Sequence, residues 1–286
     1  MLSNKVSEIM TTKLTTASTT NSIQEVLDTM VAADVGRIIV TNEEIPVGIF
    51  TEKDVMKRVV NGNVDPGKSL IKDVMTSPIR AVREETHIVE ALGKMVRGKY
   101  RHLLVRGRRG KIVGIVSMRR ILGLAVELGQ GMSESKTLGS LVSGRALSVD
   151  ESTSVAETVE LMTQKSVASV IVSVSGKPSG IFTERDVLKR VAAKRIDTKG
   201  TQVRQVMTAP LVTMVESALI GEALAEMYRR DIRNMPVVAS AGELIGIVSM
   251  PDVLQYAAAF NIDEKVRQTW KEVQEYYESE DQYTPG

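Results

Sequence analysis

The chain has no cysteine, only two histidines and few aromatic residues, which make up 3% of its 286 residues. Without cysteine it forms no disulfides and no thiolate metal sites. The two histidines, His87 and His102, leave little imidazole for catalysis or for metal binding. The scarcity of aromatic rings also argues against a surface on which nucleic-acid bases stack.

Long apolar runs and a strong excess of charge are also absent. No stretch approaches the roughly 20 apolar residues of a membrane-spanning helix, and no secretory leader is recognised. The net charge of +2 gives the chain no general attraction to nucleic acid. Apolar residues make up 43% of the chain, which is enough for packed cores. We therefore expect a soluble, cytoplasmic protein that does not contact membranes.

An internal repeat is the main feature that the chain does have. Four similar phrases, GIFTEKD, GIVSMRR, GIFTERD and GIVSMPD, begin at glycines spaced 66 residues apart, the first of them Gly48. The first and third phrases agree further downstream, and the second and fourth share GIVSM, so the larger unit is 132 residues. Such periods indicate one structural unit copied four times. The predicted domains are repeat one (1–64), repeat two (65–130), repeat three (131–197), repeat four (198–260) and a C-terminal helix and tail (261–286).

Within each repeat the pattern predicts the order β-α-β-β-α, and therefore an α/β (α+β) fold. In repeat one, apolar residues recur at helical spacing from Ile23 to Met30, and two β-rich runs around a polar turn follow. A second helix is expected from Glu52 to Val60, with Thr51 as its N-cap. One repeat is too small to bury both helices alone, so we expect the two repeats of a module to pack together.

The residues after repeat four form a separate amphipathic pattern. Ile262, Val266, Val273 and Tyr277 fall on one helical face. Two interpretations stay open: a helix that closes the end of the structure, or a helix that docks onto a partner.

Three repeats carry a Thr or Ser followed three residues later by Asp, which is the signature of a capping box at the start of a helix. The same geometry also suits a ligand. A helix N-terminus that follows a glycine attracts phosphate, an aspartate one turn along accepts hydrogen bonds from a ribose, and the glycine lets a flat base approach the strand. The pairs are Thr51 with Asp54, Thr183 with Asp186, and Ser249 with Asp252.

Repeat two departs from this pattern at two positions together. Arg120 replaces the aspartate, and it follows Arg119, so that two cations stand where the helix dipole disfavours them. The hydroxyl near the first strand is also lost, since Ala81 stands there. Three intact pockets and one altered pocket explain this pattern better than capping alone. The corresponding hydroxyl residues of the other repeats are Thr16, Ser148 and Thr213.

Four such phrases at constant spacing, each after a helix and a hairpin, resemble the CBS-domain family, named for cystathionine β-synthase. The similarity runs from Val6 to about Ala258. It implies four CBS repeats, paired into two Bateman modules that form a disk-like assembly. It also implies clefts between paired repeats that bind AMP, ADP, ATP, S-adenosylmethionine or a dinucleotide. The chain looks similar to free-standing prokaryotic CBS proteins and, more distantly, to the gamma subunit of AMP-activated protein kinase.

The resemblance also implies roles for individual residues. The three aspartates would hold the ribose hydroxyls, and the hydroxyl residues would meet the phosphate. Basic residues before the second strand would reach the phosphate in the pocket of the neighbouring repeat. Those residues are Arg101 and His102 for the Asp54 pocket, and Arg233 for the Asp186 pocket.

The other two pockets differ. The Asp252 pocket would face Val167, Ala168 and Ser169, which offer no cation, so it should bind anions more weakly. In repeat two, Arg120 would face Arg37 across the cleft.

The leading hypothesis is a non-catalytic sensor. An adenine nucleotide, accompanied by Mg²⁺ when it is ATP, would bind the clefts, and a partner protein would read the resulting change of conformation. A sensor of S-adenosylmethionine or a dinucleotide is the alternative within this class. A homodimer of disks stays open.

Two other classes of function stay open. An enzyme would need a nucleophile, a P-loop or a metal cluster, and none is evident. Glu52 and Glu184 are interpreted as solvated helix residues rather than as groups that position water or a cation. A nucleic-acid-binding regulator would use a basic hairpin, for which a solvated turn is the alternative. The hairpin residues are Arg106, Arg108, Arg109 and Lys111.

Overall fold

The computed structural model of the chain describes residues 5–98, 100–121, 136–142, 144, 146–250 and 252–253. Within these residues the order strand, helix, strand, strand, helix recurs four times, as the sequence predicts. The described part of the last helix is limited to 118–121 in repeat two and to 250 and 252–253 in repeat four. The predicted C-terminal helix and tail (261–286) lie outside the described residues.

Each repeat contributes one three-stranded sheet. The middle strand of each sheet pairs in parallel with the first strand and antiparallel with the third. The strands are β1 (Thr16–Ser18), β2 (Arg37–Asn42), β3 (Ile45–Thr51), β4 (Ala81–Arg83), β5 (His102–Arg106), β6 (Ile112–Ser117), β7 (Ser148–Asp150), β8 (Ser169–Val174), β9 (Lys177–Thr183), β10 (Met214–Val215), β11 (Asn234–Val238) and β12 (Leu244–Ser249).

The longer helices follow the first strand of each repeat, and they bury the apolar stripes that the sequence shows. They are α1 (Ile23–Ala32), α3 (Ile88–Gly98), α5 (Val155–Lys165) and α7 (Ile220–Arg229). The helix predicted from Glu52 to Val60 is present as α2 (Glu52–Asp54) and the π-helical η2 (Val55–Val60), and repeat three has the equivalent α6 (Glu184–Asp186) and η5 (Val187–Ala192). Short 3-10 turns are η1 (Val6–Glu8), η3 (Ile71–Asp73), η4 (Leu138–Leu141) and η6 (Val203–Gln205).

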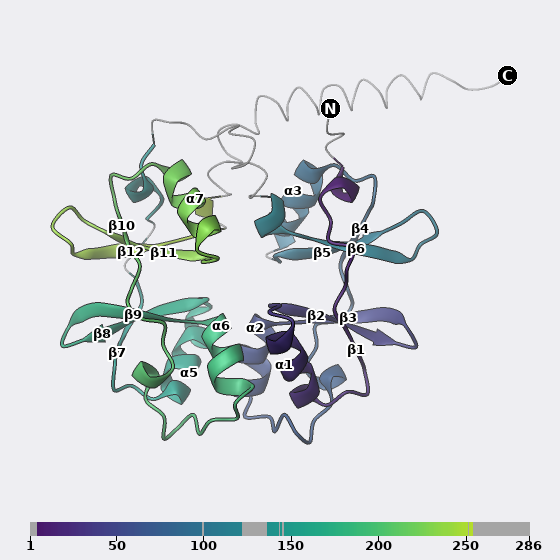
Figure 1. Cartoon of the computed structure of the whole chain (residues 1–286), viewed down its shortest axis with the longest axis horizontal. Coiled ribbons are helices and arrows are strands. Elements are labelled where there is room, and N and C mark those ends of the chain that lie inside the picture. Colours follow the sequence, from purple (N-terminus) through teal and green to yellow (C-terminus); the bar gives the residue numbers. More distant parts are fainter. Residues whose placement is uncertain are drawn as a thin grey trace.

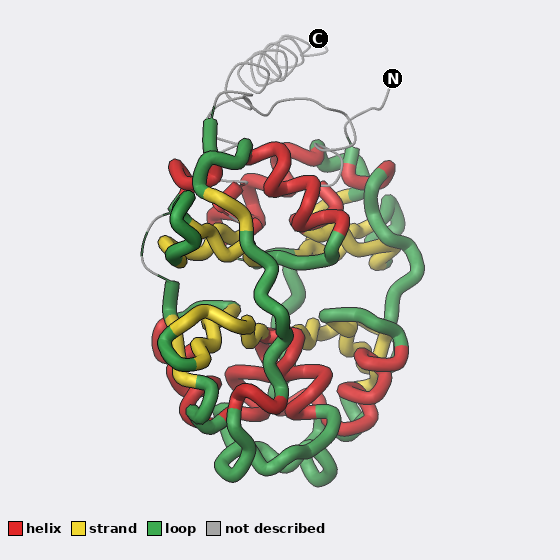
Figure 2. The backbone as a smooth tube through the Cα atoms, turned by 60° about the vertical axis from the view of Figure 1, so that its left-hand side comes forward, coloured by secondary structure: helices red, strands yellow, loops and turns green. Residues whose placement is uncertain are grey.

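The four repeats lie as the quadrants of a flattened disk, with repeats one and two on one side and repeats three and four on the other (Figure 1). The backbone seen from a second direction shows sheets and helices in the same layers (Figure 2). Helices of repeats one and three share one core, in which η2 packs against η5. A second core joins repeats two and four, with α3 and α7 contributing.

This packing corrects the expectation that a repeat buries its helices against its module partner. The helices are buried against the other module, and repeats one and two meet through their sheets. A small apolar cluster marks that contact, with Ile39, Leu104 and Ile115 at its centre. Each module therefore presents its helical faces to the other module, which brings the starts of α2 and α6 together at the centre of the disk.

The glycine of each repeated phrase is required by this pairing of repeats. A Cβ added to Gly48 would lie 2.3 Å from Sδ of Met75, a residue of the segment that opens repeat two. The same relation joins Gly114 to Met10, so each repeat of the first module places a methionine on its partner's hairpin. The Met75 side chain therefore fills the space above Gly48 where the sequence predicts that a ligand base approaches the strand. In the second module, the corresponding pairs are Gly180 with Met207 and Gly246 with Val142.

The Gly48→Ala variant should lower the free energy of unfolding by about 1–3 kcal/mol, because the methyl group overpacks the contact with Met75. Gly93→Ala is the matched control. This glycine lies in α3, and its added Cβ meets only the mobile end of Arg97. Ala there should raise stability by about 0.5–1 kcal/mol. Urea denaturation measures both, and equal effects of the two variants would contradict the packing role of Gly48.

Candidate functional site

The capping boxes predicted at the starts of α2 and α6 are present. Asp54 Oδ2 accepts hydrogen bonds from Thr51 N at 3.0 Å and from Thr51 Oγ1 at 2.7 Å. Asp186 Oδ2 accepts the same two bonds from Thr183, at 2.9 and 2.7 Å. The structural interpretation of these residues is therefore confirmed, because each aspartate closes the start of its own helix.

The second carboxylate oxygen of each aspartate has a partner that the sequence analysis missed. Thr76 Oγ1 donates to Asp54 Oδ1 at 2.8 Å, and Thr208 Oγ1 donates to Asp186 Oδ1 at 2.8 Å. A recurring Val-Met-Thr phrase is the signal for these threonines, and it ends at Thr76 and at Thr208. Each Oδ1 also lies within ion-pair distance of an arginine of its own helix, at 3.6 Å from Arg58 for Asp54 and 3.4 Å from Arg190 for Asp186. A carboxylate offers about four acceptor sites, and three of them are used by these hydrogen bonds.

Repeats four and two show the weaker versions of this motif. Asp252 Oδ2 accepts from Ser249 N at 2.7 Å and from Ser249 Oγ at 2.5 Å. In repeat two, Ser117 Oγ accepts from the backbone N–H of Arg120 at 3.2 Å, so the hydroxyl cap survives without an acid.

The hydroxyl residues near the first strands occupy equivalent positions. Thr16 pairs with Ile39, Ala81 with Leu104, and Ser148 with Ile171, while Thr213 directly precedes β10. All three hydroxyl residues are exposed, and Ser148 Oγ is 2.8 Å from Ser173 Oγ. Thr16 lies on β1 and Thr51 ends β3, at opposite sides of one sheet. That they share a ligand with the aspartates stays a prediction.

A cavity of about 300 Å³ lies between repeats one and two. Thr76 links it to Asp54, and His102 and Tyr100 line it from the side of repeat two, where the sequence analysis placed a basic stretch. Arg101 lies between these two residues in the sequence. The lining residues are Ile49, Thr76, Ser77, Pro78, Ile79, Arg80, Gly98, Tyr100, His102 and Leu104.

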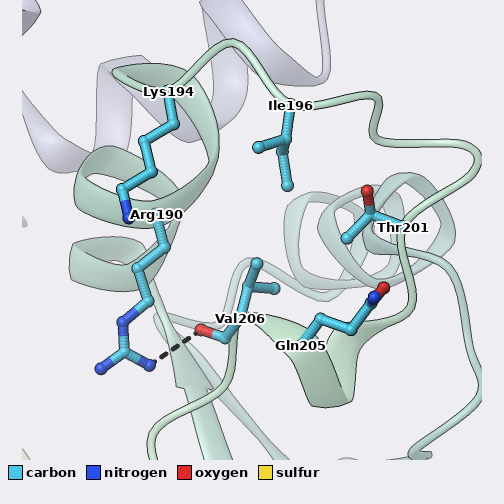
Figure 3. A pocket seen from close by; sticks show the side chains of 6 residues that line it. All are labelled: Arg190, Lys194, Ile196, Thr201, Gln205 and Val206. Carbon is cyan, nitrogen blue, oxygen red and sulfur yellow. Dashed lines mark hydrogen bonds between the residues drawn. The ribbon is translucent and has the colours of Figure 1, made fainter.

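A larger cavity, of about 420 Å³, lies at the end of η5 (Figure 3). Its most basic members are Arg190 and Lys194, but the Arg190 guanidinium already donates to the carbonyl oxygen of Val206 at 3.0 Å. Its other lining residues are Ile196, Thr201 and Gln205. None of the residues singled out in the sequence lines this cavity.

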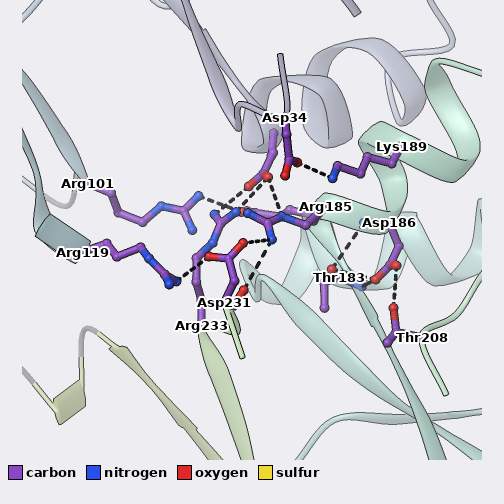
Figure 4. Close-up of polar contacts among 12 residues, drawn as sticks. Asp34, Arg101, Arg119, Thr183, Arg185, Asp186, Lys189, Thr208, Asp231 and Arg233 are labelled. Carbon is purple, nitrogen blue, oxygen red and sulfur yellow. Dashed lines mark hydrogen bonds and ion pairs between the residues drawn. The ribbon is translucent and has the colours of Figure 1, made fainter. Parts of the chain in front are cut away.

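Charged side chains from all four repeats meet at the centre of the disk (Figure 4). Glu52 and Glu184, the first residues of α2 and α6, are 2% and 5% exposed. Their expected role as solvated helix residues was therefore wrong. We call the following set the central cluster: Arg37, Glu52, Arg101, Arg119, Glu184, Arg185, Asp231 and Arg233.

Arginines of the opposite module neutralise the two glutamates. Arg233 binds Glu52 through two bonds, of 2.6 and 2.8 Å, and Arg185 Nε lies 3.5 Å from Glu52 Oε1. Arg101 Nη2 donates to Glu184 Oε2 at 2.7 Å. The sequence placed Arg101 and Arg233 near Asp54 and Asp186 of their own modules. In the structure their guanidiniums lie on Glu184 and Glu52 of the other module.

Odd and even repeats contribute opposite charges from equivalent places. The residue after each Thr or Ser cap donates its N–H to the residue before the middle strand, at 2.9–3.1 Å. In repeats one and three this pair is a glutamate and a small residue, and in repeats two and four it is a methionine and an arginine. A Cβ on Gly36 would lie 2.8 Å from Glu52 Oε1, so the glutamate side chain lies directly against this glycine. The pairs are Glu52 with Gly36, Met118 with Arg101, Glu184 with Ala168, and Met250 with Arg233.

Arg119 is one of the two cations that oppose the helix dipole in repeat two, and its contacts with repeat four explain its position. Its Nη1 lies 2.8 Å from Asp231 Oδ1, and its guanidinium lies over the Tyr228 ring at 5.2 Å from the centroid. It also donates to the Tyr228 carbonyl at 3.1 Å. These contacts join repeat two to repeat four, so Arg119 stabilises the contact between modules at the expense of its own helix start.

The charges of the central cluster shift the pKa values of Glu52 and of the neighbouring His102. Burial opposes the ionisation of Glu52, but Arg233, Arg185 and Arg101 together hold its pKa below the ordinary value. Burial, and then repulsion from Arg37, Arg101 and Arg233, lower the pKa of His102 well below the ordinary value. Glu52 is therefore ionised and His102 neutral at neutral pH.

His102 should stay neutral from neutral pH down to about pH 6, near the ordinary pKa of histidine. Because its pKa is lowered in the folded chain, its protonation favours the unfolded chain, and stability should fall as the pH drops through the ordinary histidine range. NMR of the ring nitrogens measures the charge, with His87→Asn leaving a single histidine signal. A His102 signal that titrates near the ordinary histidine pKa would contradict the burial of this side chain and its closeness to the three arginines.

Among the described residues, no group of three acidic or histidine side chains is placed to hold a metal ion. No helix within the same residues is long and apolar enough to cross a membrane.

Comparisons with a family model and with curated proteins point to the same protein family. The model of the CBS domain matches residues 6–61, 71–127, 138–193 and 203–259. The chain is 27% identical over 293 residues to the CBS domain-containing protein CBSCBSPB1 of Arabidopsis thaliana, covering 89% of this chain and 54% of that protein. It is 26% identical over 302 residues to the meiotically up-regulated gene 70 protein of Schizosaccharomyces pombe, covering 84% and 40%. The chain spans about half the length of these curated relatives or less.

Two solved structures superpose on most of the chain. Protein MJ1225 from Methanocaldococcus jannaschii, described as a candidate archaeal homologue of γ-AMPK, superposes with a TM-score of 0.77 at 16% identity, covering 88% of this chain and 99% of that one. An uncharacterised protein from Pyrococcus horikoshii gives a TM-score of 0.59 at 20% identity, with the same coverage. At these identities the likeness shows the fold.

Proposed function

This chain belongs to the CBS-domain family, and we propose that it is a sensor that binds adenine nucleotides between the paired repeats of each module. CBS-domain proteins are generally regulatory rather than catalytic. AMP, ADP or ATP, the last with Mg²⁺, is the proposed ligand, and a second protein reads its presence.

The cavity between repeats one and two is the observation that carries the proposal. It adjoins Thr76, which holds Asp54 in place, and it is lined by His102 of the facing repeat. A ribose at this position would be held by Asp54, whose carboxylate has acceptor capacity left. A phosphate would be held by the Thr51 end of α2 and by Arg101, since guanidinium groups bind phosphate strongly.

The second module repeats the hydrogen bonds around the acid, with Asp186 bound by Thr183 and Thr208, and Arg233 stands at the position of Arg101 in the sequence. We rank the clefts of Asp54 and Asp186 first, because each has both an acid and a cation. The Asp252 cleft faces Ala168 and Ser169 without a cation, and we expect weaker binding there. Repeat two has Arg120 in place of the acid, and we expect no ribose binding at that position.

The described residues give less support to the other proposed functions. Arg108, the centre of the basic hairpin, is 86% exposed and lies 3.8 and 3.6 Å from Glu84 and Glu85, so acids accompany this hairpin. This argues for a solvated turn and against nucleic-acid binding. S-adenosylmethionine and dinucleotides share the adenosine group and stay within the proposal, and a homodimer of disks is an open part of it.

Asp54→Ala and Asp186→Ala should each weaken AMP, ADP or ATP binding at their own cleft by about 10–100-fold, the cost of losing hydrogen bonds to a charged group. Titration calorimetry against a panel of adenosine compounds measures this. Arg120→Ala should change binding little.

Glu25→Ala is the matched control for these variants. Glu25 closes the capping box of α1 with Ser22, so this change removes the same kind of capping acid at a helix outside the proposed clefts. Binding should be unaffected. Equal losses in Glu25→Ala and Asp54→Ala would show that the aspartates act only as caps, and measurable ATP turnover would contradict the non-catalytic role.

A further inference from the structure

The arginines proposed to bind phosphate are already occupied by acids. Arg101 is bound to Glu184 at 2.7 Å, and Arg233 is bound to Glu52 through two bonds. Each acid belongs to the opposite module. Both arginine side chains are only partly exposed, at 30% and 25%, so solvent does not fully screen these ion pairs.

We propose that the phosphate of a bound nucleotide and the glutamate of the opposite module compete for the same arginine. Arg101 leaves Glu184 when the Asp54 cleft is filled, and Arg233 leaves Glu52 when the Asp186 cleft is filled. The inference rests on the proposed function, because it assigns the regulation of those clefts. No covalent step is involved, since one anion replaces another on a guanidinium.

The position of each glutamate links the two clefts. Glu184 directly follows Thr183 and lies two residues before Asp186, at the start of the helix where the second cleft would hold its phosphate. Glu52 holds the same position beside Thr51 and Asp54. A glutamate that loses its arginine therefore places a less compensated negative charge at the other cleft. Filling one cleft weakens binding at the other, which is a reciprocal coupling between two sites.

The two pairs are not equivalent. Glu52 lies within ion-pair distance of Arg185 as well as Arg233, so it keeps one cation when Arg233 leaves. Within the described part of the chain, Arg101 is the one cation at ion-pair distance from Glu184. A buried carboxylate without a partner is costly. The Arg101–Glu184 pair should therefore oppose nucleotide binding more strongly than the Arg233–Glu52 pair.

Glu184→Gln tests the competition. The amide keeps a hydrogen-bond acceptor for Arg101 and removes the charge, so AMP should bind the Asp54 cleft about three- to tenfold more tightly. Calorimetry in an Asp186→Ala background confines the signal to that cleft. Adenosine, which has no phosphate, should bind equally to both forms. Glu52→Gln, measured at the Asp186 cleft in an Asp54→Ala background, should give a smaller gain.

Asp65→Asn is the matched control. Asp65 pairs with Arg195 of the opposite module at 3.0 Å, so this variant removes another ion pair between modules without touching either cleft. AMP affinity should not change. Glu184→Asp, which keeps the charge but shortens the side chain, should give an intermediate gain and serves if the glutamine variant does not fold.

The outcomes separate the inference from the function on which it rests. A gain for AMP alone, absent in Asp65→Asn, supports the competition. An unchanged or weaker affinity in Glu184→Gln, or an equal gain in Asp65→Asn or for adenosine, overturns it and leaves the nucleotide sensor standing. If the unaltered chain binds no adenosine compound, the proposed function fails, and the inference fails with it.

Discussion

A carboxylate that is removed from water must meet positive charge, and this requirement governs the centre of the molecule. Glu52 and Glu184 are almost fully buried where the four repeats converge. Both glutamates belong to odd repeats, but the arginines that bind them at under 3 Å do not. The closest cations come from repeats two and four, and Arg185 of repeat three adds a longer contact to Glu52. The two modules are therefore held together by charges that each module leaves unbalanced, in addition to the two apolar cores that they share.

The duplication that produced four repeats explains how this arrangement arises from the sequence. At one structural position, odd repeats carry a glutamate beside a small residue, and even repeats carry a methionine beside an arginine. Because helices of odd repeats pack on each other, the two glutamates come to the same region and need partners from elsewhere. The same arginines stand next to the cavity-lining His102 and its counterpart Asn234. The contact between modules and the proposed binding of phosphate thus depend on the same side chains.

Much of the local structure is predictable from the sequence, because it depends on local physics. The 66-residue period and the apolar spacing predict the β-α-β-β-α order, and Thr-x-x-Asp predicts the capping boxes at α2 and α6. The partner of each buried face is not predictable in this way, since an apolar stripe shows that a helix is buried without showing against what. Glu52 reads as a surface residue of an amphipathic helix for the same reason. Its burial follows from contacts with Arg185 and Arg233, which are more than a hundred residues away in the chain. Thr76 was missed because its Val-Met-Thr phrase lies outside the glycine phrases that define the repeat.

The central claim is that one arginine serves either the opposite module or a ligand phosphate. A crystal structure of the chain with AMP tests it most directly. The account predicts AMP between repeats one and two, with the Arg101 guanidinium bonded to the phosphate and separated from Glu184. A structure in which AMP fills that cleft while Arg101 still holds Glu184 at its present 2.7 Å would contradict the account.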